Sequence, residues 1–233
     1  SLSSNNRAVL RAVAGLFIAI GPRAWGARTV NPAILLWHGF MRSPSHLAPF
    51  VHLLMSAGFT VRAPHARGPI AMNSPATARR TARLLLDSDE AGTESIIIVT
   101  HSAGAALGAW SALAVHPRQV RGLVLADGTD NLVRGFARCL PRLRGVAIHL
   151  VDADPSPCNR FGALSTQVRD THHPVHQVHV VGAGHGDIER DVGAGRERGP
   201  SAVYARVCGD RSSDAVAAQF QAAVLAAVGS LAI

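Results

Sequence analysis

Short apolar runs rich in β-branched residues recur along this chain and alternate with segments whose apolar residues have helical spacing. Such runs are typical of strands buried on both faces of a parallel sheet. Strands are predicted at 33–37, 59–63, 96–99, 120–126, 146–151 and 175–181. Helices are predicted at 47–57, 75–86, 103–110, 132–140, 161–169 and 214–231. This alternation predicts an α/β fold with a mostly parallel central sheet of about six strands and helices on both faces.

The chain has 233 residues and no visible internal repeat, so we expect 1–233 to form a single domain. Residues 1–30 have the outline of a signal peptide, with two arginines before an apolar run, but we favour a helical extension packed on the domain. About 20 residues separate the strand that ends at Ala126 from the strand that begins at Val146, which leaves no room for a large cap. No segment reaches the length of a membrane-spanning helix without interruption.

Four side chains that carry chemistry follow predicted strands: Ser102, Asp127, Asp154 and His185. The carboxyl ends of parallel strands meet at one edge of a sheet, so these residues are expected to lie near one another. A serine hydroxyl becomes a nucleophile when a base takes its proton, and that base needs a partner that fixes its tautomer. We therefore predict a catalytic triad of Ser102, His185 and Asp154.

Five short segments, in order, carry a family resemblance. Thr100-His101-Ser102-Ala103-Gly104 resembles the nucleophile elbow of the α/β-hydrolase fold, G-x-S-x-G, with threonine in place of the first glycine. The other four resemble the oxyanion loop, the P-x-x-R-G segment, the acid turn and the histidine loop of that family: Trp37-His38-Gly39-Phe40, Pro64-His-Ala-Arg-Gly68, Asp152-Ala-Asp154-Pro155 and Gly182-Ala-Gly-His185. The resemblance covers residues 33–232.

The resemblance implies hydrolysis of carboxylic esters through an acyl-serine intermediate, without cofactor or metal. It is strongest for small esterases that lack a cap, such as cutinase-like polyester hydrolases, dienelactone hydrolases and chlorophyllase-like esterases. The backbone N–H groups of Phe40 and Ala103 would form the oxyanion hole. The side chains of Phe40, Met41 and His101 would contact a small ester substrate with an apolar acyl or aromatic group.

Several assignments stay open. Asp127 and Asp130 follow the preceding strand, a position that some α/β-hydrolases use for the acid, and Asp152 is two residues from Asp154. Asp187 and Glu189 are expected to face solvent. His38 and His101 are also expected to hydrogen-bond backbone at strand ends. An acyl-thioesterase that binds phosphates through Arg134, Arg138, Arg142 and Arg144 is one alternative function, and a non-catalytic binding protein with this fold is another.

Charge and cysteine content change this picture little. The formal net charge is +8, and all 23 basic residues are arginines scattered along the chain without a nucleic-acid-binding motif, so we expect no nucleic-acid partner. The histidines near 172–185 lack a carboxylate or cysteine at a familiar ligand spacing, so we expect no metal. The three cysteines leave open whether Cys158 and Cys208 pair. The sequence settles neither the oligomeric state nor the compartment, although it slightly favours the cytoplasm over secretion.

Overall fold

The structure is a computed structural model that describes residues 32–87, 95–171, 173–192, 207–208 and 212–233. The predicted helical extension at 1–30 and most of the loop expected at 192–212 lie outside these residues. The assignment of the whole chain to one domain stays a prediction.

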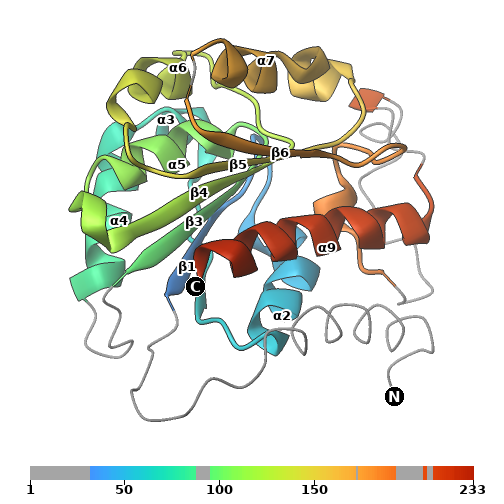
Figure 1. Cartoon of the computed structure of the whole chain (residues 1–233), viewed down its shortest axis with the longest axis horizontal. Helices are drawn as coiled ribbons and strands as arrows, with labels where there is room; N and C mark the ends of the chain where they lie inside the picture. The colour runs from blue at the N-terminus through green and yellow to red at the C-terminus, as the bar shows by residue number, and fades with distance from the viewer. Residues whose placement is uncertain (1–31, 88–94, 172, 193–206, 209–211) are drawn as a thin grey trace.

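A single sheet of six strands forms the centre of the protein, in the order β2-β1-β3-β4-β5-β6 (Figure 1). Every neighbouring pair is parallel, which confirms the predicted fold class. The strands are β1 (Ala33–Trp37), β2 (Val61–Arg62), β3 (Ile96–His101), β4 (Val120–Ala126), β5 (Ile148–Asp152) and β6 (Val175–His179).

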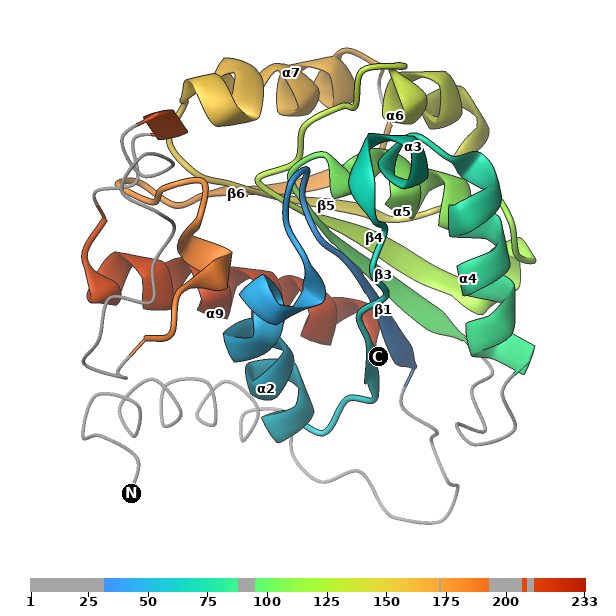
Figure 2. The same cartoon turned by 180° about the vertical axis from the view of Figure 1, so that it is seen from behind.

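Helices cover both faces of this sheet (Figures 1 and 2). One face carries α3 (Gly68–Met72), α4 (Pro75–Asp87), α5 (Gly104–Ala112), α6 (Gly135–Cys139) and α7 (Ala163–Asp170), and the other carries α2 (Ala48–Ser56) and α9 (Asp214–Leu231). Short 3₁₀ turns lie at η1 (Pro44–Leu47), η3 (Pro117–Gln119), η4 (Leu140–Arg142), η5 (Pro157–Gly162) and η6 (Asp187–Glu189). No large cap interrupts this arrangement in the part of the chain that the structure describes.

The apolar run in β3 serves both layers of the core. Successive side chains of a strand point to opposite faces, so Ile96 and Ile98 join the cluster under α4 to α7 while Ile97 and Val99 join the cluster under α2 and α9. Because both faces are covered, every residue of β3 is buried. An unbroken β-branched segment is therefore stable here, and it holds the residues that follow it in a fixed place.

Helix α9 is long and apolar enough, by length and composition alone, to cross a membrane. Its apolar side chains instead cover the sheet: Phe220, Val224, Leu225 and Val228 are buried in the cluster shared with α2. The helix begins at a capping serine, since the side chain of Ser213 accepts a hydrogen bond from the backbone N–H of Val216. Its composition is thus explained by its place in the core.

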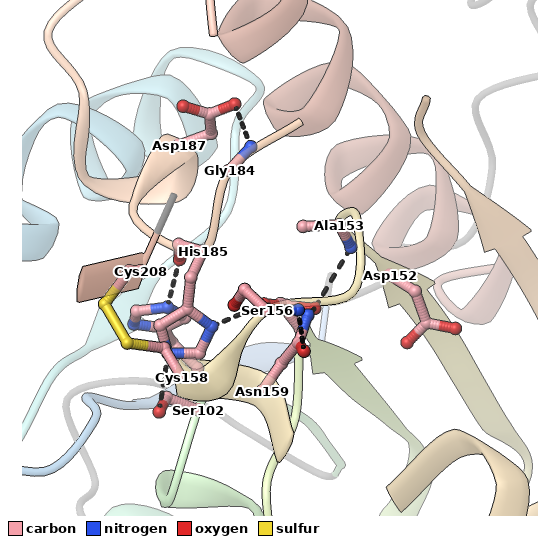
Figure 3. A network of polar contacts seen from close by, with 12 residues as sticks. Ser102, Asp152, Ala153, Ser156, Cys158, Asn159, Gly184, His185, Asp187 and Cys208 are labelled. Carbon is pink, nitrogen blue, oxygen red and sulfur yellow. Dashed lines mark hydrogen bonds and ion pairs between the residues drawn. A yellow bond between two sulfur atoms is a disulfide. The ribbon is translucent and has the colours of Figure 1, made fainter. Parts of the chain in front are cut away.

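A disulfide joins Cys158 in η5 to Cys208, which follows it by 50 residues, while Cys139 is a buried free thiol. The bond fastens the segment around Cys208 to the loop after β5 (Figure 3). The sequence left open whether Cys158 and Cys208 pair, and the structure joins them.

Candidate active site

Ser102 lies in a tight turn between β3 and α5, with a backbone φ of 54°. L-residues rarely adopt this left-handed conformation, and such strain is concentrated at functional sites. Backbone hydrogen bonds hold the turn: Ser102 N–H donates to the carbonyl of Ala126 at 3.3 Å, and Thr129 N–H donates to the carbonyl of Ser102 at 3.0 Å. The elbow is therefore fixed by the strand and loop of β4 as well as by its own helix.

Two glycines allow neighbouring backbone to approach this turn closely. A Cβ at Gly39 would lie 2.9 Å from the Cβ of Ser102, and a Cβ at Gly104 would lie 2.8 Å from the carbonyl oxygen of His38. Real Cβ atoms do not tolerate such contacts, so the loop after β1 can press against the elbow only because both residues are glycines. The segments that resemble an elbow and an oxyanion loop are thus in direct contact.

Thr100 occupies the position where the elbow pattern has its first glycine, and α5 makes room for it. A Cβ at Gly108 would lie 2.4 Å from the γ-methyl of Thr100. The Thr100 hydroxyl donates to the carbonyl of Val124 at 3.5 Å. The space usually given by a glycine on the strand is therefore supplied by a glycine on the helix.

Replacing Gly108 with alanine is expected to lower the free energy of unfolding by about 1–3 kcal/mol, because the new methyl overpacks against Thr100. Urea unfolding of Gly108→Ala, Thr100→Ser and the double variant measures this effect. Thr100→Ser removes the crowded methyl and keeps the hydroxyl, so the double variant should be more stable than Gly108→Ala alone. If the two single effects simply add, the crowding lies elsewhere.

His185 joins Ser102 to a buried carboxylate. Its Nε2 lies 2.9 Å from the Ser102 hydroxyl, and its Nδ1 contacts the carboxylate of Asp127. A carboxylate only accepts hydrogen bonds, so Nδ1 of the neutral ring carries the proton and Nε2 is free to accept from the serine. Figure 3 shows the ring of His185 beside Ser102, with the hydrogen bond between them drawn as a dashed line.

The Asp127 side chain is only 2% exposed. Besides His185, two other groups donate hydrogen bonds to its carboxylate. The backbone N–H of Ala153 donates to Oδ1 at 3.0 Å, and the side-chain amide of Asn159 donates to Oδ1 at 3.0 Å and to Oδ2 at 3.2 Å. These bonds satisfy the buried charge, as burial requires. Asn159 was missed by sequence reasoning, since an asparagine in a loop gives no signal of this role.

Asp154, the acid predicted from the sequence, does not contact His185. Its carboxylate lies 2.9 Å from Nε2 of His179 and accepts from the backbone N–H of Gly182 at 3.0 Å, and its side chain is 48% exposed. The register explains the correction, because His101 in β3 pairs with Ala126 in β4, which places the next residue, Asp127, beside the elbow. Asp154 follows β5, one strand further away.

The two other candidate acids also have different partners. Both carboxylate oxygens of Asp130 accept from backbone N–H groups, two of them at the start of α6. Asp152 accepts from the side chains of Ser165 and Gln177, each at 2.6 Å. Neither carboxylate is hydrogen-bonded to His185. Of the four aspartates that the sequence offered as the acid, only Asp127 contacts this histidine.

Burial lowers the pKa of His185 below its ordinary value of 6.5, and the hydrogen bond that His185 donates to Asp127 opposes this shift. The positive charge of nearby His101 lowers it further. A lowered pKa keeps the imidazole neutral to a more acidic pH than usual. His185 is therefore in the state that can accept a proton at neutral pH.

A buried charged network underlies the histidine loop. His101 is fully buried and donates from Nε2 to the carbonyl of His185 at 2.8 Å, while its Nδ1 lies 3.4 Å from Oε1 of Glu189. Glu189 also pairs with Arg42 at 3.1 Å. Burial disfavours a charged His101, but the Glu189 carboxylate, the His185 carbonyl and the Asp127 charge together raise its pKa.

This network corrects three expectations. His101 is buried and cannot contact substrate; it supports the backbone of His185 instead. Glu189 and Asp187 were expected to face solvent, but their exposures are 6% and 0%. Asp187 accepts from the backbone N–H of Gly184 at 2.9 Å (Figure 3) and from the hydroxyl of Ser212. Both carboxylates therefore fix the loop that carries His185.

The loop after β1 provides the groups expected to form the oxyanion hole and substrate contacts. Among the described residues, the backbone N–H groups of Phe40 and Ala103 donate no hydrogen bond. The side chains of Phe40 and Met41 are 42% and 85% exposed. His38 has the expected backbone role, since its Nε2 accepts from Ala66 N–H at 3.1 Å and its Nδ1 donates to the Gly39 carbonyl at 2.8 Å.

In the described part of the chain, no group of three or more His, Cys, Asp or Glu side chains is placed to hold a metal ion.

Comparisons with known proteins identify the fold. No model of a protein family and no curated protein matches the chain, but solved structures do. A predicted CIB-like hydrolase from Thermoplasma acidophilum has 19% identity and a TM-score of 0.55, over 71% of this chain and 83% of that one. Dienelactone hydrolase from Anabaena variabilis has 13% identity and a TM-score of 0.56, over 67% and 77%.

An uncharacterized protein from Bacillus cereus has 13% identity and a TM-score of 0.54 over 72% of this chain, which spans 59% of that longer protein. At these identities the matches show the fold. Together with the six-stranded parallel sheet, they show that this chain has the α/β-hydrolase fold.

Proposed function

We propose that this chain, which has the α/β-hydrolase fold, is a serine hydrolase that cleaves carboxylic esters through an acyl-serine intermediate. One observation carries the proposal: Ser102, His185 and Asp127 are joined in a continuous line of hydrogen bonds. Nucleophile, base and orienting acid are the three parts that such a mechanism needs.

The reaction would proceed in two halves. Nε2 of His185 takes the proton of Ser102 as its Oγ attacks the ester carbonyl, and the same imidazolium then protonates the leaving alcohol. Water, activated by His185, attacks the acyl-enzyme and releases the acid. Asp127 keeps the proton on Nδ1 and stabilises the imidazolium.

The tetrahedral intermediate carries a negative oxygen that needs hydrogen-bond donors. The backbone N–H groups of Phe40 and Ala103 donate to no other described group, and the elbow and the loop after β1 are in contact. We propose that these two groups form the oxyanion hole. A donor of this kind contributes about 3–4 kcal/mol to transition-state stability.

The exposed side chains of Phe40 and Met41 favour substrates with an apolar acyl or aromatic group near the scissile bond. Because no large cap covers the described residues, the substrate would enter from solvent without displacing a domain. The proposed substrate class is therefore a small carboxylic ester, with no cofactor in the reaction.

A fluorophosphonate probe tests the nucleophile directly. The protein should become labelled at one site per chain, on the peptide that contains Ser102, and Ser102→Ala should not react. Ser45→Ala, in the exposed η1 turn, is the matched control and should label fully. Absence of labelling together with absence of ester hydrolysis would instead favour a non-catalytic binding protein with this fold.

A further inference from the structure

A pocket of about 240 Å³ opens among the loops that follow β4 and β5. Its walls include Thr129, Asp130, Arg134, Asn159, Arg160 and Leu164. Neither Arg134 nor Arg160 is used by the proposed triad or oxyanion hole. The pocket is therefore available for a part of the substrate away from the reacting bond.

Two residues of the pocket wall, Thr129 and Asn159, are hydrogen-bonded to proposed catalytic residues. The pocket therefore adjoins the proposed active site. The backbone N–H of Thr129 donates to the carbonyl of Ser102 at 3.0 Å. The amide of Asn159 donates to the carboxylate of Asp127. A molecule held in this pocket would lie against the same loops that support the nucleophile and the acid.

The two arginines reach the pocket from separate loops, and both have unusual backbone conformations. Arg134 has φ 52° and Arg160 has φ 49°, a left-handed conformation that residues other than glycine rarely adopt. Within the described residues, neither guanidinium has a hydrogen bond or an ion pair, whereas Arg42 and Arg190 are both paired with carboxylates.

Asp130, the acid in the pocket wall, does not form an ion pair with either arginine. Asp130 uses Oδ1 for the backbone N–H groups of Asn131 and Phe136, at 2.8 and 2.9 Å, and Oδ2 for that of Ala137 at 3.0 Å. It is thus held by the start of α6. Two arginines and one aspartate among the residues that line the pocket give its lining an excess of positive charge.

We infer that this pocket binds an anionic group, a carboxylate or a phosphate, at the far end of the substrate, with Arg134 and Arg160 as its ligands. Guanidinium groups suit both anions because their N–H donors match two oxygens at once. Leu164 supplies an apolar wall for the linker between the anion and the scissile bond. This inference rests on the proposed function and narrows its substrate class to anionic esters or thioesters.

The first test compares p-nitrophenyl hemiglutarate, which carries a free carboxylate, with p-nitrophenyl valerate, a neutral ester of the same acyl length. We expect kcat/KM of the wild type to be about tenfold higher for the anionic ester, and Arg134→Gln/Arg160→Gln to remove that preference. The neutral ester should change less than about threefold. Arg80→Gln, an exposed arginine of α4 outside the pocket wall, is the matched control and should keep the preference.

A second arm distinguishes the two anions. Butyryl-coenzyme A carries phosphates, and the butyryl thioester of N-acetylcysteamine is its neutral counterpart. A charge preference that appears only with the coenzyme A thioester, and is lost in the double arginine variant, identifies phosphate. A preference only with the hemiglutarate identifies carboxylate. No preference in either pair, or an equal loss on charged and neutral substrates, would overturn the inference.

Failure of the proposed function can be separated from failure of this inference. If no ester or thioester is hydrolysed, calorimetric titration of glutarate and of inorganic phosphate still tests the pocket. Binding by the wild type and by Arg80→Gln, but not by the double arginine variant, would support the inference. Equal binding or no binding in all three proteins would contradict it.

Discussion

Replacing Asp127 with asparagine is expected to lower kcat for ester hydrolysis about 10⁴-fold, the size seen when the acid of such a triad loses its charge. The hydrogen bonds around Asp127 explain why. Ala153 N–H and the Asn159 amide both donate to Oδ1, so the carbonyl oxygen of an asparagine must take that place. Its NH₂ group then faces Nδ1 of His185 and stabilises the wrong tautomer, with the proton on Nε2.

Asp154→Asn is the matched comparison, because the sequence favoured that residue as the acid. Its carboxylate is hydrogen-bonded to His179 and to the backbone of Gly182, and not to His185. The kcat of this variant should therefore stay within about threefold of the wild type. Steady-state kinetics on a p-nitrophenyl ester, with circular dichroism to confirm folding, measures both variants. A large loss for Asp154→Asn and a small one for Asp127→Asn would contradict the assignment of the acid.

Ser102→Ala is expected to lower kcat by about 10⁶-fold, since it removes the proposed nucleophile. His185→Ala should have an effect of similar size. Because the serine and histidine act as one unit, the double variant should be no slower than either single variant. Residual hydrolysis above the rate in water would come from the oxyanion hole and from substrate binding.

The kinetics of the Ser102→Ala/His185→Ala double variant test whether the two residues act together. If the losses in Ser102→Ala and His185→Ala multiply, the two residues do not act together, and the hydrogen bond of 2.9 Å between them has another purpose. If Ser102→Ala keeps activity within tenfold of the wild type, a different group is the nucleophile. Either protein should retain the wild-type circular dichroism spectrum.

Local pattern was sufficient for most of the elements and for the turn that carries Ser102, although it did not predict α3. The β-branched run before Ser102 predicted a strand buried on both faces, and β3 is buried throughout. Strand alternation along the chain predicted the parallel sheet, and the prediction of 120–126 coincides with β4. These features depend on neighbours in the sequence, so the sequence contains them.

The sequence explains only part of how Thr100 fits into the elbow. The sequence indicated that a threonine must fit where the elbow pattern has a glycine, but it did not indicate how. Only the packing of α5 on the sheet shows that Gly108 supplies the missing space. The two residues are eight positions apart and belong to different elements, so no local pattern relates them.

The choice of acid, by contrast, required the tertiary structure. The sequence placed Asp127 and Asp154 each after a strand but could not tell which strand lies next to β3. Strand order and register decide this, and β4 pairs with β3 while β5 does not. The spacing of residues along the chain contains no such information, because pairing depends on contacts between distant segments.

The buried carboxylates behind the histidine loop depend on the same kind of contact. Asp187 and Glu189 look like ordinary surface acids in sequence, since charged residues after a glycine-rich turn are usually solvated. Their burial is tolerated because Glu189 meets His101 from β3 and Arg42 from the loop after β1. The sequence thus determined the strands, the turn at Ser102 and the place of His185 after β6, and the folded sheet decided which charges are paired, because a buried charge is stable only beside partners that folding brings to it.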